Sequence, residues 1–227
     1  MDKLRVTVVI PAYNEEKNIK RVIDEVRPLC DDVLVVLSKK SNDKTADIVK
    51  GCGVKYVVDN GKGKGDAIRL AIGNITEGVI VFFDADGSHD PQDIPRLAKP
   101  IQDDAADLVM GSRMTGGSDE LHGKLDEFLR LMFSNMITLI INYRFKVCYT
   151  DYQNGLRAIR ATTAKKLKLE ENITTIEQEI AIKCLKAGCR ITEIPTHEYF
   201  GGPSSFNVWK VGPRYFWSLV KNMISRK

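Results

Sequence analysis

Short apolar runs alternate with segments of helical periodicity through the first half of the chain. The apolar runs are rich in Val, Ile and Leu and almost uninterrupted, as is typical of strands buried on both faces of a parallel sheet. They are Val6–Ile10, Val33–Leu37, Val54–Val58, Val79–Phe83 and Leu108–Met110. The helical segments between them are Glu15–Val26, Thr45–Lys50, Asp66–Ile72 and Pro91–Lys99. This alternation predicts a doubly wound α/β sheet, in which ligands bind beyond the carboxyl ends of the strands.

The second half of the chain leaves this alternation after Gly116-Gly117. Its pattern predicts a helix at Leu125–Asn142, a helix at Glu177–Ala187 and a strand at Arg190–Ile194. From Tyr199 onward the chain has no acidic residue, and basic side chains alternate with Trp, Tyr and Phe. We therefore expect one α/β domain over residues 1–205, followed by a basic, aromatic segment over residues 206–227 that forms an amphipathic helix.

Composition narrows the class of protein. The 227 residues include 34 Lys and Arg and 30 Asp and Glu, a formal charge of +4, and 43% are apolar. These values fit a globular domain, exclude collagen and extended disorder, and give no nucleic-acid-binding signature, so we expect no nucleic-acid partner. Five cysteines without a C-x-x-C pair argue against zinc and a disulfide framework, and for a reducing compartment. We expect neither a signal peptide nor a spanning helix, which needs about 18 apolar residues.

Two acidic residues, Asp84 and Asp86, follow the run Val79–Phe83 and so stand at the carboxyl end of a buried strand. In an extended segment the side chains at i and i+2 point to the same side, and two close carboxylates repel each other unless a cation neutralises them. Carboxylate oxygens suit Mg²⁺ or Mn²⁺, which bind one or two carboxylates together with substrate phosphates. A strand cap followed by a polar turn is the alternative interpretation.

A second candidate segment follows the first strand. Pro11 ends that strand, Tyr13 offers an aromatic face for stacking, and Glu15 stands at the N-terminus of a predicted helix, where the helix dipole stabilises a carboxylate. A capping turn that binds nothing has the same pattern.

Two more segments carry groups that bind phosphates. The run Asn60–Asp66 places Lys64, and glycines that are expected to expose their backbone N–H groups, before a helix, which suits a diphosphate, although its spacing is not that of a P-loop. Arg113 follows another strand, where a guanidinium can hold phosphate oxygens through two hydrogen bonds. Solvated turns remain the alternative for both.

These segments occur in one order along the chain: Val8–Glu15, Ser41–Thr45, Gly63–Gly65, Asp84–Asp86, Gly111–Arg113 and Asp151–Arg157. The series resembles the family 2 glycosyltransferases of the GT-A fold. Within them it most resembles the dolichyl- and polyprenyl-phosphate sugar synthases, such as the dolichol-phosphate mannose synthases. The resemblance covers nearly the whole chain and implies a Rossmann-like, mostly parallel sheet flanked by helices.

The resemblance also implies an activity: inverting, Mg²⁺- or Mn²⁺-dependent transfer of a sugar from GDP-mannose or a UDP-hexose to a polyprenyl or dolichyl phosphate. It implies that the nucleotide-sugar contacts Pro11, Tyr13, Glu15, Ser38, Lys64 and Ala85. Asp84 and Asp86 would hold the metal, and Arg113 would bind a phosphate of the donor or the acceptor. Arg130, in the predicted long helix, would help to receive the acceptor phosphate, and the segment Asp151–Arg157 would shape the acceptor side.

The sequence departs from the family pattern in three places, one of which is Ser88, where the mannose synthases often have Gln. Where the family reads Val-Asp-Asp-Gly-Ser after the second strand, this chain reads Leu37-Ser38-Lys39-Lys40-Ser41. The segment Tyr199–Ser205 lacks the basic residues that the family has near its end. The departure after the second strand leaves the base of the nucleotide, guanine or uracil, open.

A lipid-phosphate acceptor requires an enzyme that reaches a membrane surface. Trp and Phe together with Lys and Arg in the tail are typical of an interfacial helix, although the same aromatic side chains can instead pack on the domain. We expect a protein of the cytoplasm, bound peripherally to the cytoplasmic face of the membrane.

The sequence does not exclude two other functions. A soluble glycosyltransferase acting on a hydroxyl acceptor needs a general base, and Glu177 and Glu179 are the spare carboxylates, although a solvated helix face is the expected state of both. The other is a nucleotide-sugar-binding homologue without catalysis.

Overall fold

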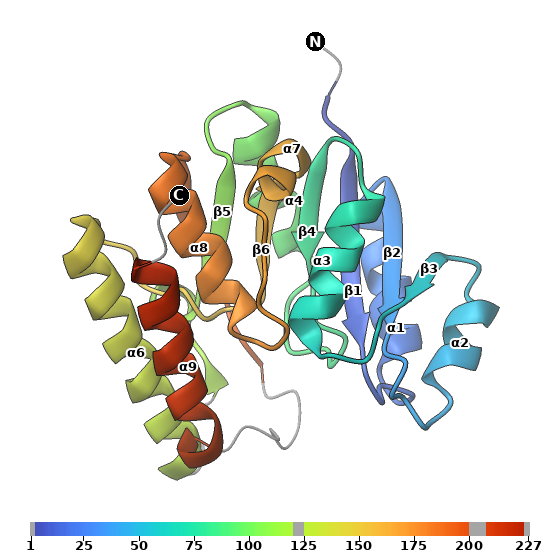
Figure 1. Cartoon of the computed structure of the whole chain (residues 1–227). Helices are drawn as coiled ribbons and strands as arrows, with labels where there is room; N and C mark the ends of the chain where they lie inside the picture. Colours follow the sequence, from blue (N-terminus) through green and yellow to red (C-terminus); the bar gives the residue numbers. More distant parts are fainter. Residues whose placement is uncertain (1–2, 120–124, 200–207, 225–227) are drawn as a thin grey trace.

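The computed structural model describes residues 3–119, 125–199 and 208–224, and a seven-stranded sheet runs through it (Figure 1). The strand order is β3-β2-β1-β4-β6-β5-β7. The strands are β1 (Val6–Ala12), β2 (Asp32–Leu37), β3 (Lys55–Val58), β4 (Val79–Phe82), β5 (Leu108–Ser112), β6 (Arg157–Arg160) and β7 (Ile191–Pro195). Only β6 runs antiparallel to its neighbours β4 and β5, which confirms the expected mostly parallel α/β sheet.

Helices cover both faces of the sheet, each over its own hydrophobic cluster. One face carries α1 (Ile19–Val26), α2 (Thr45–Gly51) and α4 (Asp93–Gln102). The other carries α3 (Lys64–Asn74), α7 (Ala161–Lys166) and α8 (Ile176–Ala187), with α6 (Leu125–Phe145) and α9 (Val208–Ile224) beside them (Figure 1). Two short elements, η1 (Arg27–Leu29) and α5 (Arg113–Gly116), complete the described elements.

The six predicted strands are confirmed within two residues at each end, but the start of the first helix is wrong. The pattern predicts Glu15–Val26, whereas α1 begins at Ile19. The backbone N–H groups of Glu15 and Glu16 are held instead by the side chains of Thr45 (2.7 Å) and Asp43 (3.0 Å), at the start of α2. These side chains fix a turn before the helix can begin.

The sequence pattern also misses β6, a strand of four residues that begins and ends with Arg. It pairs with β4 and β5, which lie far from it in the sequence, so the local pattern does not indicate it. It matters for function because β6 places the preceding segment Asp151–Gly155 at the edge of the sheet where β4 and β5 point.

The C-terminal helix α9 is amphipathic, as expected. Tyr215 and Leu219 are buried in the same cluster as residues of α6 and α8, while Phe216 and Trp217 are exposed. Some aromatic side chains of α9 therefore pack against the domain, and others are exposed to solvent. The predicted domain boundary at residue 205 lies outside the described residues and stays a prediction.

Candidate active site

The carboxyl ends of four adjacent parallel strands form one edge of the sheet, and a cavity of about 460 Å³ lies along it. The cavity is lined by all eight residues that the sequence places at the nucleotide-sugar or the metal. They are Pro11, Tyr13, Glu15, Ser38, Lys64, Asp84, Ala85 and Asp86. The fold thus gathers segments that are up to 75 residues apart in the chain, as expected for strand ends in a doubly wound sheet.

Each of these residues is placed by the end of its strand. Pro11 lies within β1 opposite Val36, and Ser38 continues the β1–β2 ladder because its N–H donates to the carbonyl of Ala12 (2.9 Å). Glu15 follows the turn after β1. Burial, opposed by a hydrogen bond from Asn18, raises its carboxyl pKa above the ordinary value.

The glycine-rich loop before α3 packs closely against the segment around Asn172. The N–H of Gly61 donates to the carboxylate of Asp59 (2.7 Å), and that of Gly65 donates to the carbonyl of Asn172 (2.9 Å). A Cβ at Gly63 would lie 2.7 Å from the same carbonyl. The expectation that the glycines of this loop expose their N–H groups is therefore wrong at Gly61 and Gly65, and the charge available to a diphosphate comes from lysine.

Lys64 stands at the centre of an ion-pair triad in which Glu177 is buried and Lys64 and Asp84 are partly buried. Its ammonium lies 2.6 Å from Oδ1 of Asp84 and 3.0 Å from Oε1 of Glu177. Burial would lower the pKa of Lys64, but these two carboxylates outweigh it and raise the pKa. Burial would likewise raise the pKa of Asp84, and the charge of Lys64, with a hydrogen bond from His89, holds it far below the ordinary value. Asp84 is therefore ionised and already paired.

Asp86 is arranged differently from Asp84. Its Oδ1 accepts a hydrogen bond from the N–H of Ser88 (2.9 Å), which fixes the carboxylate beside the cavity, and Gly87 makes the turn with φ +78°. Within the described part of the chain, no three His, Cys, Asp or Glu residues are grouped to hold a metal. A divalent ion at Asp84 and Asp86 would thus need oxygens from a substrate, which is how Mg²⁺ commonly binds.

A second cavity, of about 190 Å³, adjoins the first and shares Lys64, Asp84 and Asp86 with it. Its other walls mix polar residues of the strand ends with apolar side chains of α6 and α9: Leu131, Phe133, Ile137 and Tyr215. Oε2 of Glu177, on α8, is buried in this wall without a hydrogen-bond partner. An unpaired buried carboxylate oxygen is costly, so it marks a position where a ligand donor fits.

Glu177 and Glu179 are both buried, so the expectation of a solvated helix face is wrong. Helix α8 is covered by the sheet on one side and by α9 on the other, which leaves neither residue a solvated face. Glu179 has a structural role, because its carboxylate accepts from the N–H groups of Glu170 and Glu171 and pairs with Lys183.

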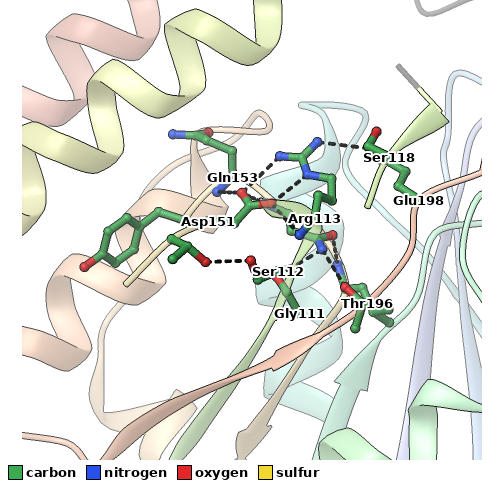
Figure 2. A network of polar contacts seen from close by, with 12 residues as sticks. Gly111, Ser112, Arg113, Ser118, Asp151, Gln153, Thr196 and Glu198 are labelled. Atoms are coloured by element: carbon green, nitrogen blue, oxygen red, sulfur yellow. Dashed lines mark hydrogen bonds and ion pairs between the residues drawn. The ribbon is translucent and has the colours of Figure 1, made fainter. Parts of the chain in front are cut away.

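Arg113 also lines the second cavity, but two carboxylates hold its guanidinium (Figure 2). Its Nε and Nη2 donate to the two oxygens of Asp151 (2.7 and 3.0 Å), and Nη1 donates to Glu198 (3.1 Å). Burial would lower the pKa of Arg113, but Asp151 and Glu198 outweigh it and raise the pKa. The side chain of Arg130 lies outside the described residues, so its role stays a prediction.

The segment Asp151–Gly155 bridges the strands around this cavity. Asn154 donates to the carbonyl of Gly111 (3.0 Å), and Gln153 donates to Gln178 on α8 (3.1 Å). At Gly155 a Cβ would lie 2.5 Å from Oδ2 of Asp84, so the backbone passes directly over the triad. The family resemblance had assigned Gly155, within Asp151–Arg157, to the acceptor side, but sequence reasoning did not assign Asp59 or Glu198 to the site. The only signal in the sequence was that Asp59 follows a predicted strand.

A parallel sheet with a polar cavity along its strand ends, beside acidic and lysine side chains, defines a nucleotide-binding α/β protein. The comparisons with known proteins give its family. The family model "Glycosyl transferase family 2" matches residues 7–166, and the chain belongs to that family. It is a glycosyltransferase of the GT-A fold, which confirms the resemblance seen in the sequence.

Three similar proteins show how far the likeness extends. An uncharacterized protein of Methanocaldococcus jannaschii is 33% identical over 196 residues, which cover 82% of this chain and 84% of that protein. The UDP-N-acetylglucosamine–dolichyl-phosphate N-acetylglucosaminyltransferase of Methanococcus voltae is 29% identical over 219 residues, covering 86% and 85%. Glucosyl-3-phosphoglycerate synthase of Mycobacterium tuberculosis, solved with Mn²⁺, UDP and phosphoglyceric acid, superposes with a TM-score of 0.77 at 20% identity, over 99% of this chain and 80% of that one.

Proposed function

We propose that this glycosyltransferase transfers a hexose from a nucleotide-diphospho-sugar to a polyprenyl phosphate, with inversion and with Mg²⁺ or Mn²⁺. The observation that carries the proposal is the pair of adjoining cavities that share Lys64, Asp84 and Asp86. The larger has a size and polarity that suit a nucleoside diphosphate, and the smaller joins charged groups to apolar walls, as an amphipathic acceptor requires. The name of the Methanococcus voltae relative supports the lipid acceptor.

The chemistry that the shared residues offer agrees with this assignment. Sugar transfer develops negative charge on the departing diphosphate, and a cation beside it stabilises that charge. Asp84 and Asp86 would hold a divalent ion, which supplies Lewis-acid stabilisation of the leaving group when bound. Lys64 adds a second positive charge at the junction of the cavities. A phosphate acceptor is ionised near neutral pH, so it needs no general base.

The membrane surface is the second part of the proposal. Met132, Met136, Leu139 and Tyr143 recur at helical spacing on the exposed side of α6, and Phe216 and Trp217 are exposed on the neighbouring α9. Both helices also wall the smaller cavity, so a lipid bound there would lie beside this apolar surface. In the described segments, no helix has the length and hydropathy to cross a bilayer.

The transfer assay offers UDP-hexoses and GDP-mannose, each with a polyprenyl phosphate and Mn²⁺. We expect a glycolipid product from one donor, and a loss of at least about 10²-fold in Asp86→Asn, because the leaving charge loses its metal. Asp47→Asn, at an exposed position of α2, is the matched control. No product from any donor would overturn the lipid-phosphate assignment.

A vesicle assay tests the membrane part. Co-sedimentation with phosphatidylglycerol vesicles should fall in the Leu139→Glu/Trp217→Glu variant and stay at the wild-type level in Tyr56→Glu, which changes an exposed aromatic residue of β3 instead. Equal binding of the wild type and both variants would contradict the proposed membrane surface.

One observation favours a second candidate function, transfer to a hydroxyl acceptor. Oε2 of Glu177 lacks a partner within the smaller cavity, and a carboxylate there can accept the proton of an attacking hydroxyl. Glu177→Gln separates the two functions: transfer to a hydroxyl should fall by about 10²- to 10⁴-fold, whereas transfer to an ionised phosphate should persist.

A further inference from the structure

The donor cavity contains a carboxylate that the family resemblance does not account for. Asp59 follows β3, and its N–H donates to the carbonyl of Leu37 (2.9 Å), so the residue extends the β2–β3 ladder to the cavity edge. The residue is 5% exposed and lines the cavity together with Ser38. The acids that the family has after its second strand are absent here, and an acid from the neighbouring strand lies beside their position.

The carboxylate of Asp59 is fixed in orientation through one oxygen. Oδ1 accepts hydrogen bonds from the N–H groups of Lys39 (2.9 Å) and Gly61 (2.7 Å). Two hydrogen bonds fill the lone-pair directions of that oxygen. No hydrogen bond or ion pair from the described residues uses Oδ2, which leaves this oxygen for a ligand in the cavity.

The strand order sets the distance between Asp59 and the Asp84–Asp86 pair, and this distance suits the nucleoside of a nucleotide bound along the strand ends. The strand order β3-β2-β1-β4 puts Asp59 three strands away from the Asp84–Asp86 pair. Strands lie about 4.8 Å apart, so the separation is roughly 14 Å. A diphosphate placed at Asp86 and Lys64 therefore extends its nucleoside along the strand ends toward Asp59.

We propose that Asp59 reads the base of the donor nucleotide, and that the base is uracil, with N3–H donating to Oδ2. Guanine presents two adjacent donors, N1–H and N2–H, which match a carboxylate with both oxygens free, and Asp59 has only one. Uracil presents a single donor between two carbonyls. Lys40 extends over Gly61, with its Cγ and Cε 3.4 and 3.5 Å from a Cβ built there, and its ammonium supplies a donor for a uracil carbonyl. The inference rests on the nucleotide cavity of the proposed function and deepens it.

The test measures nucleotide binding by calorimetry with Mn²⁺ and needs no lipid. Wild-type protein should bind UDP more tightly than GDP, and more tightly than N3-methyl-UDP by about 10- to 100-fold, because a hydrogen bond to a charged group is lost. Asp59→Asn keeps an oxygen for Lys39 and Gly61 and turns an NH₂ group toward the base. The affinity of this variant for UDP should therefore fall by a similar factor. The variant should bind CDP, whose N3 is an acceptor, more tightly than UDP.

Asp47→Asn removes the same charge on the exposed side of α2 and should bind UDP as the wild type does. Equal affinity of the wild-type protein for UDP and N3-methyl-UDP overturns the inference without any variant. Parallel loss of UDP and CDP affinity in Asp59→Asn also overturns it, since that pattern reports a structural role in the loop. If UDP binds without this discrimination, the inference alone fails; if no nucleotide binds, the proposed function fails with it.

Discussion

Gly155→Ala is the substitution whose effect follows most directly from the geometry of the site. The added Cβ would lie 2.5 Å from Oδ2 of Asp84 and 2.7 Å from Nζ of Lys64, whereas ordinary contact begins at 3.4 Å. The Asp84 carboxylate would therefore have to move by about 0.9 Å, out of the position set by Lys64 and His89. A displacement of about 1 Å at a reacting centre costs about 10²-fold in rate.

The same clash lowers stability less than it lowers activity. Overpacking of this kind costs about 1–3 kcal/mol, which corresponds to a fall in Tm of about 2–12 °C in a domain of this size. We would measure hexosyl transfer at a temperature where both proteins are folded, with Tm from circular dichroism. If Gly155→Ala kept full transfer activity, the reasoning that the backbone at Gly155 fixes the position of the Asp84 carboxylate would be refuted.

Three further predictions concern stability. Lys64→Met should destabilise the fold by about 3 kcal/mol in urea unfolding, because it removes the ammonium that the carboxylates of Asp84 and Glu177 share, and adding Glu177→Gln should recover part of the loss. A hydrogen bond from Arg190 lowers the pKa of Asp107 to about 2, so its stabilisation is present above about pH 4 and is lost as the pH falls toward 2. Asp107→Asn should thus be less stable than the wild type at pH 6 and equal to it near pH 2; a gap that persists at pH 2 would contradict this. Gly73 lies within α3, and apart from its chain neighbours and the backbone of its own helix no described atom lies within 4 Å of a Cβ built there. Gly73→Ala should raise stability by about 0.5–1 kcal/mol and Tm by about 1–4 °C, because glycine loses more backbone freedom on folding than alanine does, and an unchanged Tm would contradict this.

The donor side of the site was predictable because it depends on local pattern. Apolar runs define the strands, and the carboxyl ends of adjacent parallel strands meet at one edge, so residues such as Tyr13 and Asp86 were expected together before any contact was known. The same logic applied to Asp59, which also follows a predicted strand. It was missed because nothing local shows that its loop turns the carboxylate into the cavity.

The smaller cavity, proposed for the acceptor, was not predictable from local pattern, because it is built by packing across the fold. The strand β6 is short and polar at both ends, and its antiparallel insertion sets the segment around Gly155 over Asp84. Burial of Glu177 depends on α9 covering α8, a contact between segments about 40 residues apart. Periodicity within α8 cannot show a second covering surface, so a solvated face was the natural expectation.

The charges around the smaller cavity link the identity of the acceptor to the metal. Among the described residues that line it, Asp84, Asp86, Glu177 and Glu198 are acidic, and only Lys64 and Arg113 are basic. Arg113 is further neutralised by Asp151, outside the wall. A phosphate entering this cavity alone would meet net negative charge, whereas a divalent ion on Asp84 and Asp86 would offset two of the carboxylates. We therefore expect a lipid-phosphate acceptor to bind only after the metal-bound donor, whereas a hydroxyl acceptor carries no charge and needs no metal in order to bind beside the free oxygen of Glu177.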